Sequence, residues 1–211
     1  MTDTGAKTAP LKTIESWFQL PVLDETLAQS GNPLTAFKRC LVQGKEILGQ
    51  QFDNGVGAPV LIRARSWQID ELLLRAWSRF MNSDDGEATL VAVGGYGRSE
   101  LMPGSDIDLL ILLPDDENNR FDSHITELIT FLWDIGLEVG HSVRTIEECI
   151  QQSLADVTVV TNLMEARLLA GSEELFRRMQ NSTAPGEIWN SRTFFEVKST
   201  EQRSRYKKFH D

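Results

Sequence analysis

Two aspartates separated by one residue, Asp106 and Asp108, follow a glycine pair, Gly94-Gly95, after ten intervening residues. Residues two apart on a β-strand point to the same face, so these carboxylates would stand side by side. Two close carboxylates repel each other unless a cation shares them, and Mg²⁺ prefers oxygen ligands while it keeps waters and phosphates in its shell. The spacing therefore predicts a magnesium site with Asp106 and Asp108 as its catalytic ligands.

The glycine pair ends a predicted strand, Thr89–Val93. Glycine has no Cβ, so backbone N–H groups at Gly94 and Gly95 could approach an anion closely. A short helix expected from Tyr96 to Leu101 would add the positive end of its dipole. A glycine pair alone is usually a tight turn, and two aspartates alone are usually solvated or capping residues. Together they favour metal-assisted phosphoryl or nucleotidyl transfer.

The elements that must hold these residues alternate between strands and helices. The apolar run from Asp108 to Leu113 predicts a strand buried on both faces. Strands are expected at 89–93, 108–113 and 137–143, and helices at 33–53, 58–81, 123–133, 157–169, 173–179 and 194–206. Thr145 and Glu148 fit a capping box at the start of a further helix. Gly171 is expected to cap the helix that ends at Leu169.

Composition limits the classes of partner and compartment. The 211 residues have a formal net charge of −10, which disfavours nucleic acid because phosphate binding requires clustered cations. Cys40 and Cys149 are distant in sequence and lack a CxxC pattern, so a structural zinc site is not expected. No apolar stretch is long enough for a membrane span, and the first ten residues lack a signal-peptide core. We therefore expect no membrane association and a cytoplasmic protein.

Three segments carry a family resemblance: GGYGRSELMPGSDIDLLIL, LWDIGLEVGHSVRT and DVTVVTNLMEARLLAG. They resemble the N-terminal nucleotidyltransferase domain of bacterial PII uridylyltransferase/uridylyl-removing enzymes, within the DNA polymerase beta-like nucleotidyltransferase superfamily. The likeness covers roughly residues 33 to 210. It implies an enzyme that transfers UMP from UTP to a tyrosine of the PII nitrogen-signalling protein, using Mg²⁺ and releasing pyrophosphate.

The residue patterns and the resemblance together predict a fold and a set of domains. The fold is α+β, with a small mixed β-sheet nucleotidyltransferase core flanked by helices, an N-terminal helical hairpin and a C-terminal helical extension. The predicted division is a loosely ordered leader over 1–30, a helical segment over 31–82, the core over 83–171 and the extension over 172–211. Family members continue into a phosphohydrolase domain and glutamine-sensing domains, so we expect this chain to be a fragment that lacks them.

Site roles follow from the same resemblance. The glycine pair would contact the triphosphate, Asp106 and Asp108 would hold magnesium, and Arg98 and Ser105 would help to bind the nucleotide. Glu138 is the candidate third metal ligand, although it could instead pair with Arg144.

Two further residues, His141 and Ser99, have no single role that the sequence can assign. His141 is either a hydrogen-bonded structural residue or a substrate contact. Ser99 stands where the family leads us to expect glycine, which would cost little if the local helix is regular.

Two alternatives remain open from the sequence. One is an adenylyltransferase of the same superfamily that acts on a protein or a small molecule, because the side chains that choose the base cannot be identified. The other is a non-catalytic nucleotide-binding module.

Overall fold

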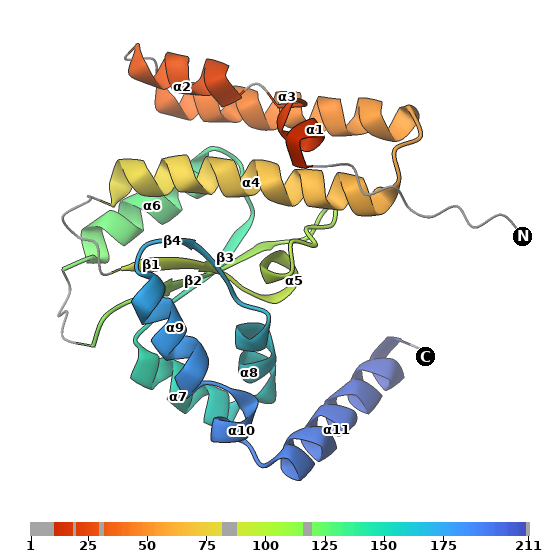
Figure 1. The fold of residues 1–211 in the computed structure, drawn as a ribbon, viewed down its shortest axis with the longest axis vertical. Helices are drawn as coiled ribbons and strands as arrows, with labels where there is room; N and C mark the ends of the chain where they lie inside the picture. The colour runs from red at the N-terminus through yellow and green to blue at the C-terminus, as the bar shows by residue number, and fades with distance from the viewer. Residues whose placement is uncertain (1–10, 19, 30–31, 82–87, 116–119, 210–211) are drawn as a thin grey trace, which may run out of the picture. The chain divides into compact units, whose positions relative to one another are not determined.

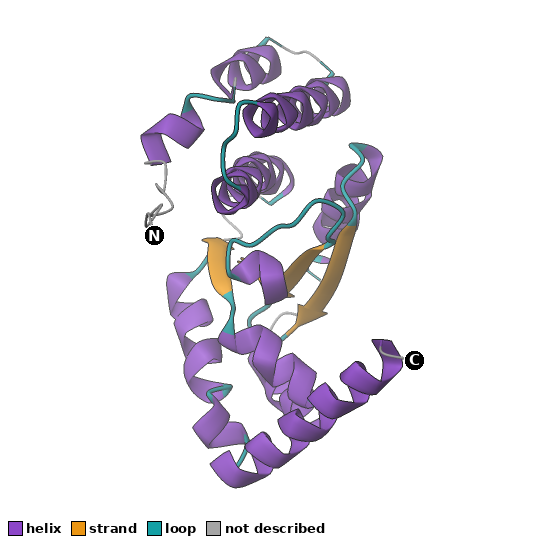
Figure 2. Ribbon diagram, turned by 90° about the vertical axis from the view of Figure 1, so that its right-hand side faces the viewer, coloured by secondary structure: helices purple, strands orange, loops and turns teal. Residues whose placement is uncertain are grey.

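The computed structural model describes residues 11–18, 20–29, 32–81, 88–115 and 120–209. Contacts group the chain into two compact units that interleave in sequence. The first unit comprises residues 1–83, 99–107 and 122–140, and the second comprises 84–98, 108–121 and 141–211. Helices make up most of the described chain (Figure 2). The four-part division expected from the sequence stays a prediction.

The first unit is built from helices. Their bounds are α1 Leu11–Glu15, α2 Leu20–Ala28, α3 Pro33–Asp53, α4 Ala58–Phe80 and α6 Asp122–Asp134 (Figure 1). The side chain of Asn32 caps α3 by accepting hydrogen bonds from the N–H groups of Leu34 and Thr35, and Pro33 follows at the first helical position. The two long helices expected from the apolar periodicity are therefore confirmed, with α4 ending one residue early.

Helices α3 and α4 approach closely at a glycine. Gln68 of α4 is 3% exposed and donates from Nε2 to the carbonyl oxygen of Cys40, 3.0 Å away. A Cβ on Gly44 of α3 would lie 1.8 Å from that same nitrogen. Phe37 also packs edge-on against Phe131 of α6, with ring centroids 5.0 Å apart. A buried polar bond and an aromatic pair thus fix how α3 packs in this unit.

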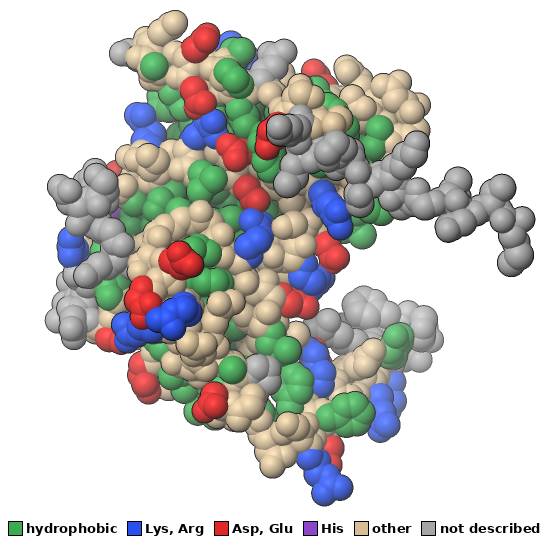
Figure 3. All heavy atoms as spheres, in the orientation of Figure 1, with side chains coloured by type: hydrophobic (Ala, Val, Ile, Leu, Met, Phe, Trp, Pro, Cys, Tyr) green, Lys and Arg blue, Asp and Glu red, His purple; other side chains and the backbone are tan. Residues whose placement is uncertain are grey.

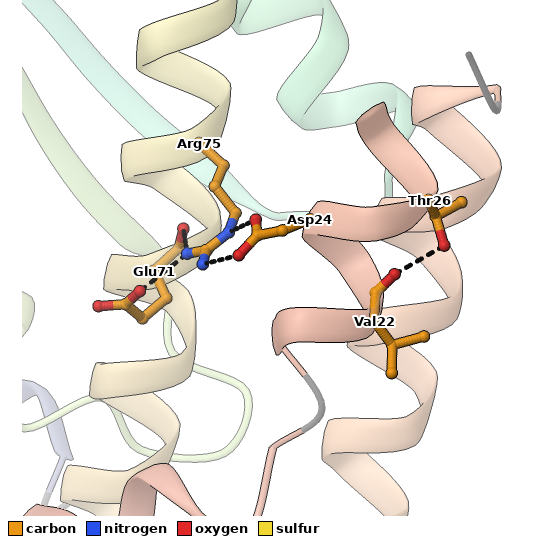
Figure 4. Close-up of polar contacts among 5 residues, drawn as sticks. All are labelled: Val22, Asp24, Thr26, Glu71 and Arg75. Atoms are coloured by element: carbon orange, nitrogen blue, oxygen red, sulfur yellow. Dashed lines mark hydrogen bonds and ion pairs between the residues drawn. The ribbon is translucent and has the colours of Figure 1, made fainter. Parts of the chain in front are cut away.

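The expectation of a loosely ordered leader is wrong for residues 11–18 and 20–28, which include α1 and α2; residues 1–10, 19 and 30 lie outside the described residues. Apolar side chains of this segment are buried in the core: Ile14, Phe18, Leu20 and Leu23. Asp24 of α2 forms a two-pronged ion pair with Arg75 of α4, at 2.6 and 2.8 Å (Figure 4). Arg75 also binds Glu71 at 2.8 Å. Burial and this ion pair order the segment, an effect that a window of mixed composition does not reveal.

A four-stranded sheet forms the centre of the second unit. Its strands are β1 Thr89–Ala92, β2 Ile107–Leu112, β3 Val139–Arg144 and β4 Arg167–Ala170, in the order β3-β2-β1-β4. Strand β1 is antiparallel to both β2 and β4. The N–H of Ile107 donates to Glu138 and the N–H of Leu113 to Arg144, a constant offset that makes β2 and β3 parallel. The sheet is therefore mixed, which confirms the predicted α+β fold class.

The described residues of the second unit also form six helices, three of which pack against one face of the sheet. Their bounds are α5 Gly94–Gly97, α7 Ile146–Ala155, α8 Val157–Met164, α9 Glu173–Ser182, α10 Pro185–Ile188 and α11 Ser191–Phe209. Strand residues Val91, Val93, Leu110 and Leu112 share a buried cluster with side chains of α7, α8 and α9. The capping box expected at Thr145 and Glu148 is present at the start of α7. Apolar alternation on the strands and capped helices thus build one core.

Asp156 is both the last cap of α7 and the first cap of α8. Its Oδ1 accepts hydrogen bonds from the backbone N–H and the hydroxyl of Thr158, each at 2.7 Å. These hydrogen bonds, first that of the Thr158 hydroxyl, lower the pKa of the Asp156 carboxyl. Asp156 is therefore the single residue between the two helices.

The helix expected over 157–169 is wrong in its second half, because α8 ends at Met164 and Arg167–Ala170 forms β4. Arginine, leucine and alanine favour helices, so local propensity points the wrong way here. Pairing with β1 satisfies backbone groups along that strand and overrides the propensity. Gly171 has a φ of +98°, and its Cβ would lie 2.3 Å from the carbonyl oxygen of Ala88. It therefore ends a strand rather than capping a helix.

None of the helices in the part of the chain that the structure describes is long and apolar enough to cross a membrane.

Candidate active site

Strand β1 leads directly into α5, which is a single turn from Gly94 to Gly97 rather than the expected helix from Tyr96 to Leu101. Its cap residue Val93 donates its N–H to the carbonyl oxygen of Asp108 at 3.1 Å, which ties the loop to β2 within the second unit. One turn aligns few peptide dipoles, so the helix dipole contributes less here than the sequence suggested. The close approach that glycine allows is the feature that remains.

Gly94 faces two polar side chains. Its φ is +60°, and a Cβ at this position would lie 3.3 Å from Oδ2 of Asp108 and 3.8 Å from Oδ1 of Asn162. A side chain would therefore strain the backbone and enter the space between these groups. The structure thus brings Gly94 and Asp108 together, and it adds Asn162 of α8 to them.

The aspartates alternate with apolar residues at the start of β2, as expected. Asp106 and Asp108 are exposed, whereas Ile107 and Leu109 are each 2% exposed. Among the described residues, no three His, Cys, Asp or Glu side chains are grouped closely enough to hold a metal ion. Both aspartates thus lie on the exposed side of this segment, and their role as metal ligands stays a prediction.

Glu138 lies beside the start of β2 in the first unit. Its carbonyl oxygen accepts the N–H of Ile107 at 2.9 Å, and its own side chain is exposed. Burial lowers the pKa of Arg65, and the nearby Glu138 carboxylate partly opposes that shift. Glu138 therefore has a cationic neighbour, Arg65, that the sequence did not suggest, and its role as a third metal ligand stays a prediction.

Arg98 forms an ion pair with the carboxylate of Glu165, which directly follows α8. The Arg98 side chain is 45% exposed, so this charge is only partly screened from solvent. Ser105 donates its N–H to the carbonyl oxygen of Met102 at 3.1 Å within a turn. The roles of both residues in nucleotide binding stay predictions, and Arg98 is now seen to have a carboxylate partner.

The connection from α8 to β4 holds α5 in place. Arg167 donates from Nε to the carbonyl oxygen of Gly97 at 3.2 Å and from Nη2 to that of Tyr96 at 3.3 Å. Its guanidinium carbon lies 5.5 Å from the centroid of the Tyr96 ring. A Cβ on Gly97 would lie 2.1 Å from the carbonyl oxygen of Glu165. Charge, hydrogen bonding and close packing thus fix the glycine turn against this connection.

Sequence reasoning did not single out Asn162, Glu165 and Arg167, because it placed all three in one helix over 157–169. The charged pair in LMEARLLAG was the available signal, since an apolar stretch rarely contains Glu and Arg without partners. Ser99 is a second correction. Because α5 ends at Gly97, Ser99 lies outside a regular helix and adopts a φ of 60°, the left-handed conformation that glycine prefers.

Helix α11 carries the described cations Arg192, Lys198, Arg203 and Lys207, and Figure 3 shows several Lys and Arg side chains along it. The expectation that nucleic acid is not a partner stays a prediction.

Comparisons with known proteins find one family model and a group of similar proteins. The family model described as "Nucleotidyltransferase domain" matches residues 74–169. Proteins named bifunctional uridylyltransferase/uridylyl-removing enzyme are similar over 185 residues, or 88% of this chain. They include those of Pseudomonas fluorescens at 48% identity, Pseudomonas syringae pv. syringae at 46% and Azotobacter vinelandii at 46%. The chain spans 21% of the length of these relatives.

Proposed function

We propose that this chain transfers UMP from UTP to a tyrosine of a PII signalling protein and releases pyrophosphate, because residues 74–169 match the model of the nucleotidyltransferase domain family. The relatives at 46–48% identity are named for uridylyl transfer and removal, which supports UMP as the transferred group. The chain matches 21% of their length, so only the transfer half of that name is proposed for it.

One observation carries the proposal. Gly94 presents a bare Cα next to the Asp108 carboxylate, and Asp106 is exposed two residues before it. A nucleotidyltransferase needs a surface on which a triphosphate can lie close to the main chain and next to carboxylates. Any side chain at residue 94 would occupy that space.

The donor set fits Mg²⁺, which we propose as the cofactor. Asp106 and Asp108 offer carboxylate oxygens, the ligand type that this hard cation prefers. Two protein carboxylates are typical of magnesium sites in which waters and substrate phosphates complete the shell. The bound ion would neutralise the charge that develops on the phosphate oxygens.

We propose that the remaining residues of the site bind the triphosphate or position the glycine turn. Gly94 and Gly95 leave room for the triphosphate, and we propose that Arg98 and Ser105 also bind the nucleotide. Arg167 and Glu165 keep the glycine turn at a fixed distance from Asp108. Because binding geometry sets much of the rate in such transfers, small displacements of this turn would slow the reaction.

The comparisons do not favour an adenylyltransferase or a non-catalytic module. A screen of the four nucleoside triphosphates would separate these possibilities. Uridylyl transfer would be selective for UTP, and a non-catalytic module would bind a nucleotide without transferring it.

The test is label transfer from UTP to a purified PII protein in the presence of Mg²⁺. The Asp106→Asn/Asp108→Asn double variant is expected to lose transfer. A Glu127→Gln/Asp134→Asn double variant removes the same charge from exposed positions on α6 and should retain it. Transfer by the Asp106→Asn/Asp108→Asn variant at the wild-type rate would refute the proposed metal ligands. Absence of both transfer and metal-dependent UTP binding in the wild type would refute the proposed function.

A further inference from the structure

We propose that Asn162 is a nucleotide-binding residue whose carboxamide donates a hydrogen bond to a phosphate oxygen of the substrate. This inference rests on the proposed function, because it assigns Asn162 to the same site. It concerns a residue of α8, which lies within the helix expected over 157–169.

The position of Asn162 is the first observation. Its Oδ1 and the Oδ2 of Asp108 both lie within 4 Å of the point where a Cβ on Gly94 would stand. Gly94 has no side chain, so this point is open to a ligand. A triphosphate placed against Gly94 and near the Asp108 carboxylate would therefore be within reach of the Asn162 carboxamide.

The surroundings of Asn162 are the second observation. Val157, Val160 and Leu163 are the buried residues of α8, whereas Asn162 is exposed. Its side chain makes no hydrogen bond or ion pair with any residue that the structure describes. An asparagine inside a helix either points into solvent or binds a nearby backbone or side-chain group. Asn162 is of the first kind. Its side-chain oxygen is the atom nearest the open point beside Gly94, so a half-turn of the carboxamide would bring the N–H₂ group there.

The chemistry of the amide suits this location. A carboxamide offers two N–H donors and no net charge, so it can bind a phosphate oxygen without disturbing the nearby Asp108. A carboxylate at residue 162 would have nearly the same shape but would repel both Asp108 and the phosphate. Charge and hydrogen bonding can therefore be tested separately at this position.

The experiment measures the dissociation constant of Mg²⁺–UTP and the KM for UTP in transfer to PII. Asn162→Ala is expected to raise both about ten- to hundredfold, the range for a hydrogen bond to a charged group. Asn162→Asp should raise them further, because it adds repulsion at unchanged shape. Met164→Ala truncates another exposed side chain of α8 and should behave like wild type. Circular dichroism and thermal unfolding check that each variant keeps its fold.

Two results would overturn the inference while leaving the proposed function standing. One is wild-type binding of UTP with both Asn162 variants within twofold of it. The other is weakened binding by Asn162→Ala but not by Asn162→Asp, because an acceptor would then suffice at this position. If the wild type binds no UTP at all, the proposed function fails and this inference fails with it.

Discussion

Replacing Gly97 with alanine would place a methyl group 2.1 Å from the carbonyl oxygen of Glu165. The separation must rise to at least 3.0 Å, and the obstacle is main chain, so a side-chain rotation cannot relieve it. Overpacking of this kind costs about 1–3 kcal/mol, or a fall of about 2–12 °C in Tm for a chain of this size. Because α5 must move away from the α8 end, Gly94 should also shift relative to Asp108. A displacement of the reacting groups by about 1 Å can slow a reaction that depends on their alignment by up to about 100-fold.

The assay combines thermal unfolding with transfer of label from UTP to PII. Gly49→Ala is the control, because a Cβ there meets nothing within 4 Å and the site is exposed on α3. That change should raise stability by up to about 1 kcal/mol, since alanine favours a helix interior. A Gly97→Ala variant with the Tm and transfer rate of wild type would refute the argument that close packing at Glu165 positions the glycine turn.

Three further outcomes are expected. Ser99→Gly should raise the free energy of unfolding by up to about 1 kcal/mol in urea, because Ser99 occupies the left-handed region; a decrease would contradict this. The hydrogen-bonded ion pair between Asp24 and Arg75 lowers the pKa of the Asp24 carboxyl below the ordinary 3.8. The stability that this ion pair gives is therefore present above about pH 4 and is lost as pH falls. Asp24→Asn should therefore cost at most about 1 kcal/mol at pH 7, since Asp24 is half exposed, and almost nothing at pH 2; an equal cost at both values would exclude the ion pair as the cause. Burial raises the pKa of Cys149 to about 11, so a thiol reagent at pH 8 should label it only after unfolding, and rapid labelling of the folded chain would show that it is accessible.

Local patterns were sufficient for most elements of the fold. The apolar spacing of α3 and α4, the alternation at Asp106–Leu109 and the capping box at Thr145 all depend on residues within a few positions of one another. Each was predicted correctly because the pattern and the final environment agree. Strand β4 could not be predicted in this way, since its partner β1 lies more than 70 residues earlier and local propensity favoured a helix.

The candidate site likewise has a part that local sequence patterns predicted and a part that they did not. The spacing of Gly94, Asp106 and Asp108 was visible in the sequence, and so was the need for glycine at residue 94. The hydrogen bonds from Arg167 and the ion pair of Glu165 depend on where α8 ends, which the sequence did not reveal. The left-handed conformation of Ser99 accompanies the early end of α5 at Gly97. The sequence had predicted a helix that continued to Leu101, so this conformation was not expected.

Asp156 joins α7 to α8 without a spacer, and this has a consequence for local opening of the second unit. When the last turn of α7 frays, the residue that caps the first turn of α8 moves with it. The two helices should therefore open as one cooperative segment rather than independently. The rigidity with which α8 presents Asn162 then depends on the stability of α7, a helix whose buried face ends in the core at Cys149 and Ser153. Substitutions that loosen α7 can thus weaken the exposed face of α8 without altering any residue on it.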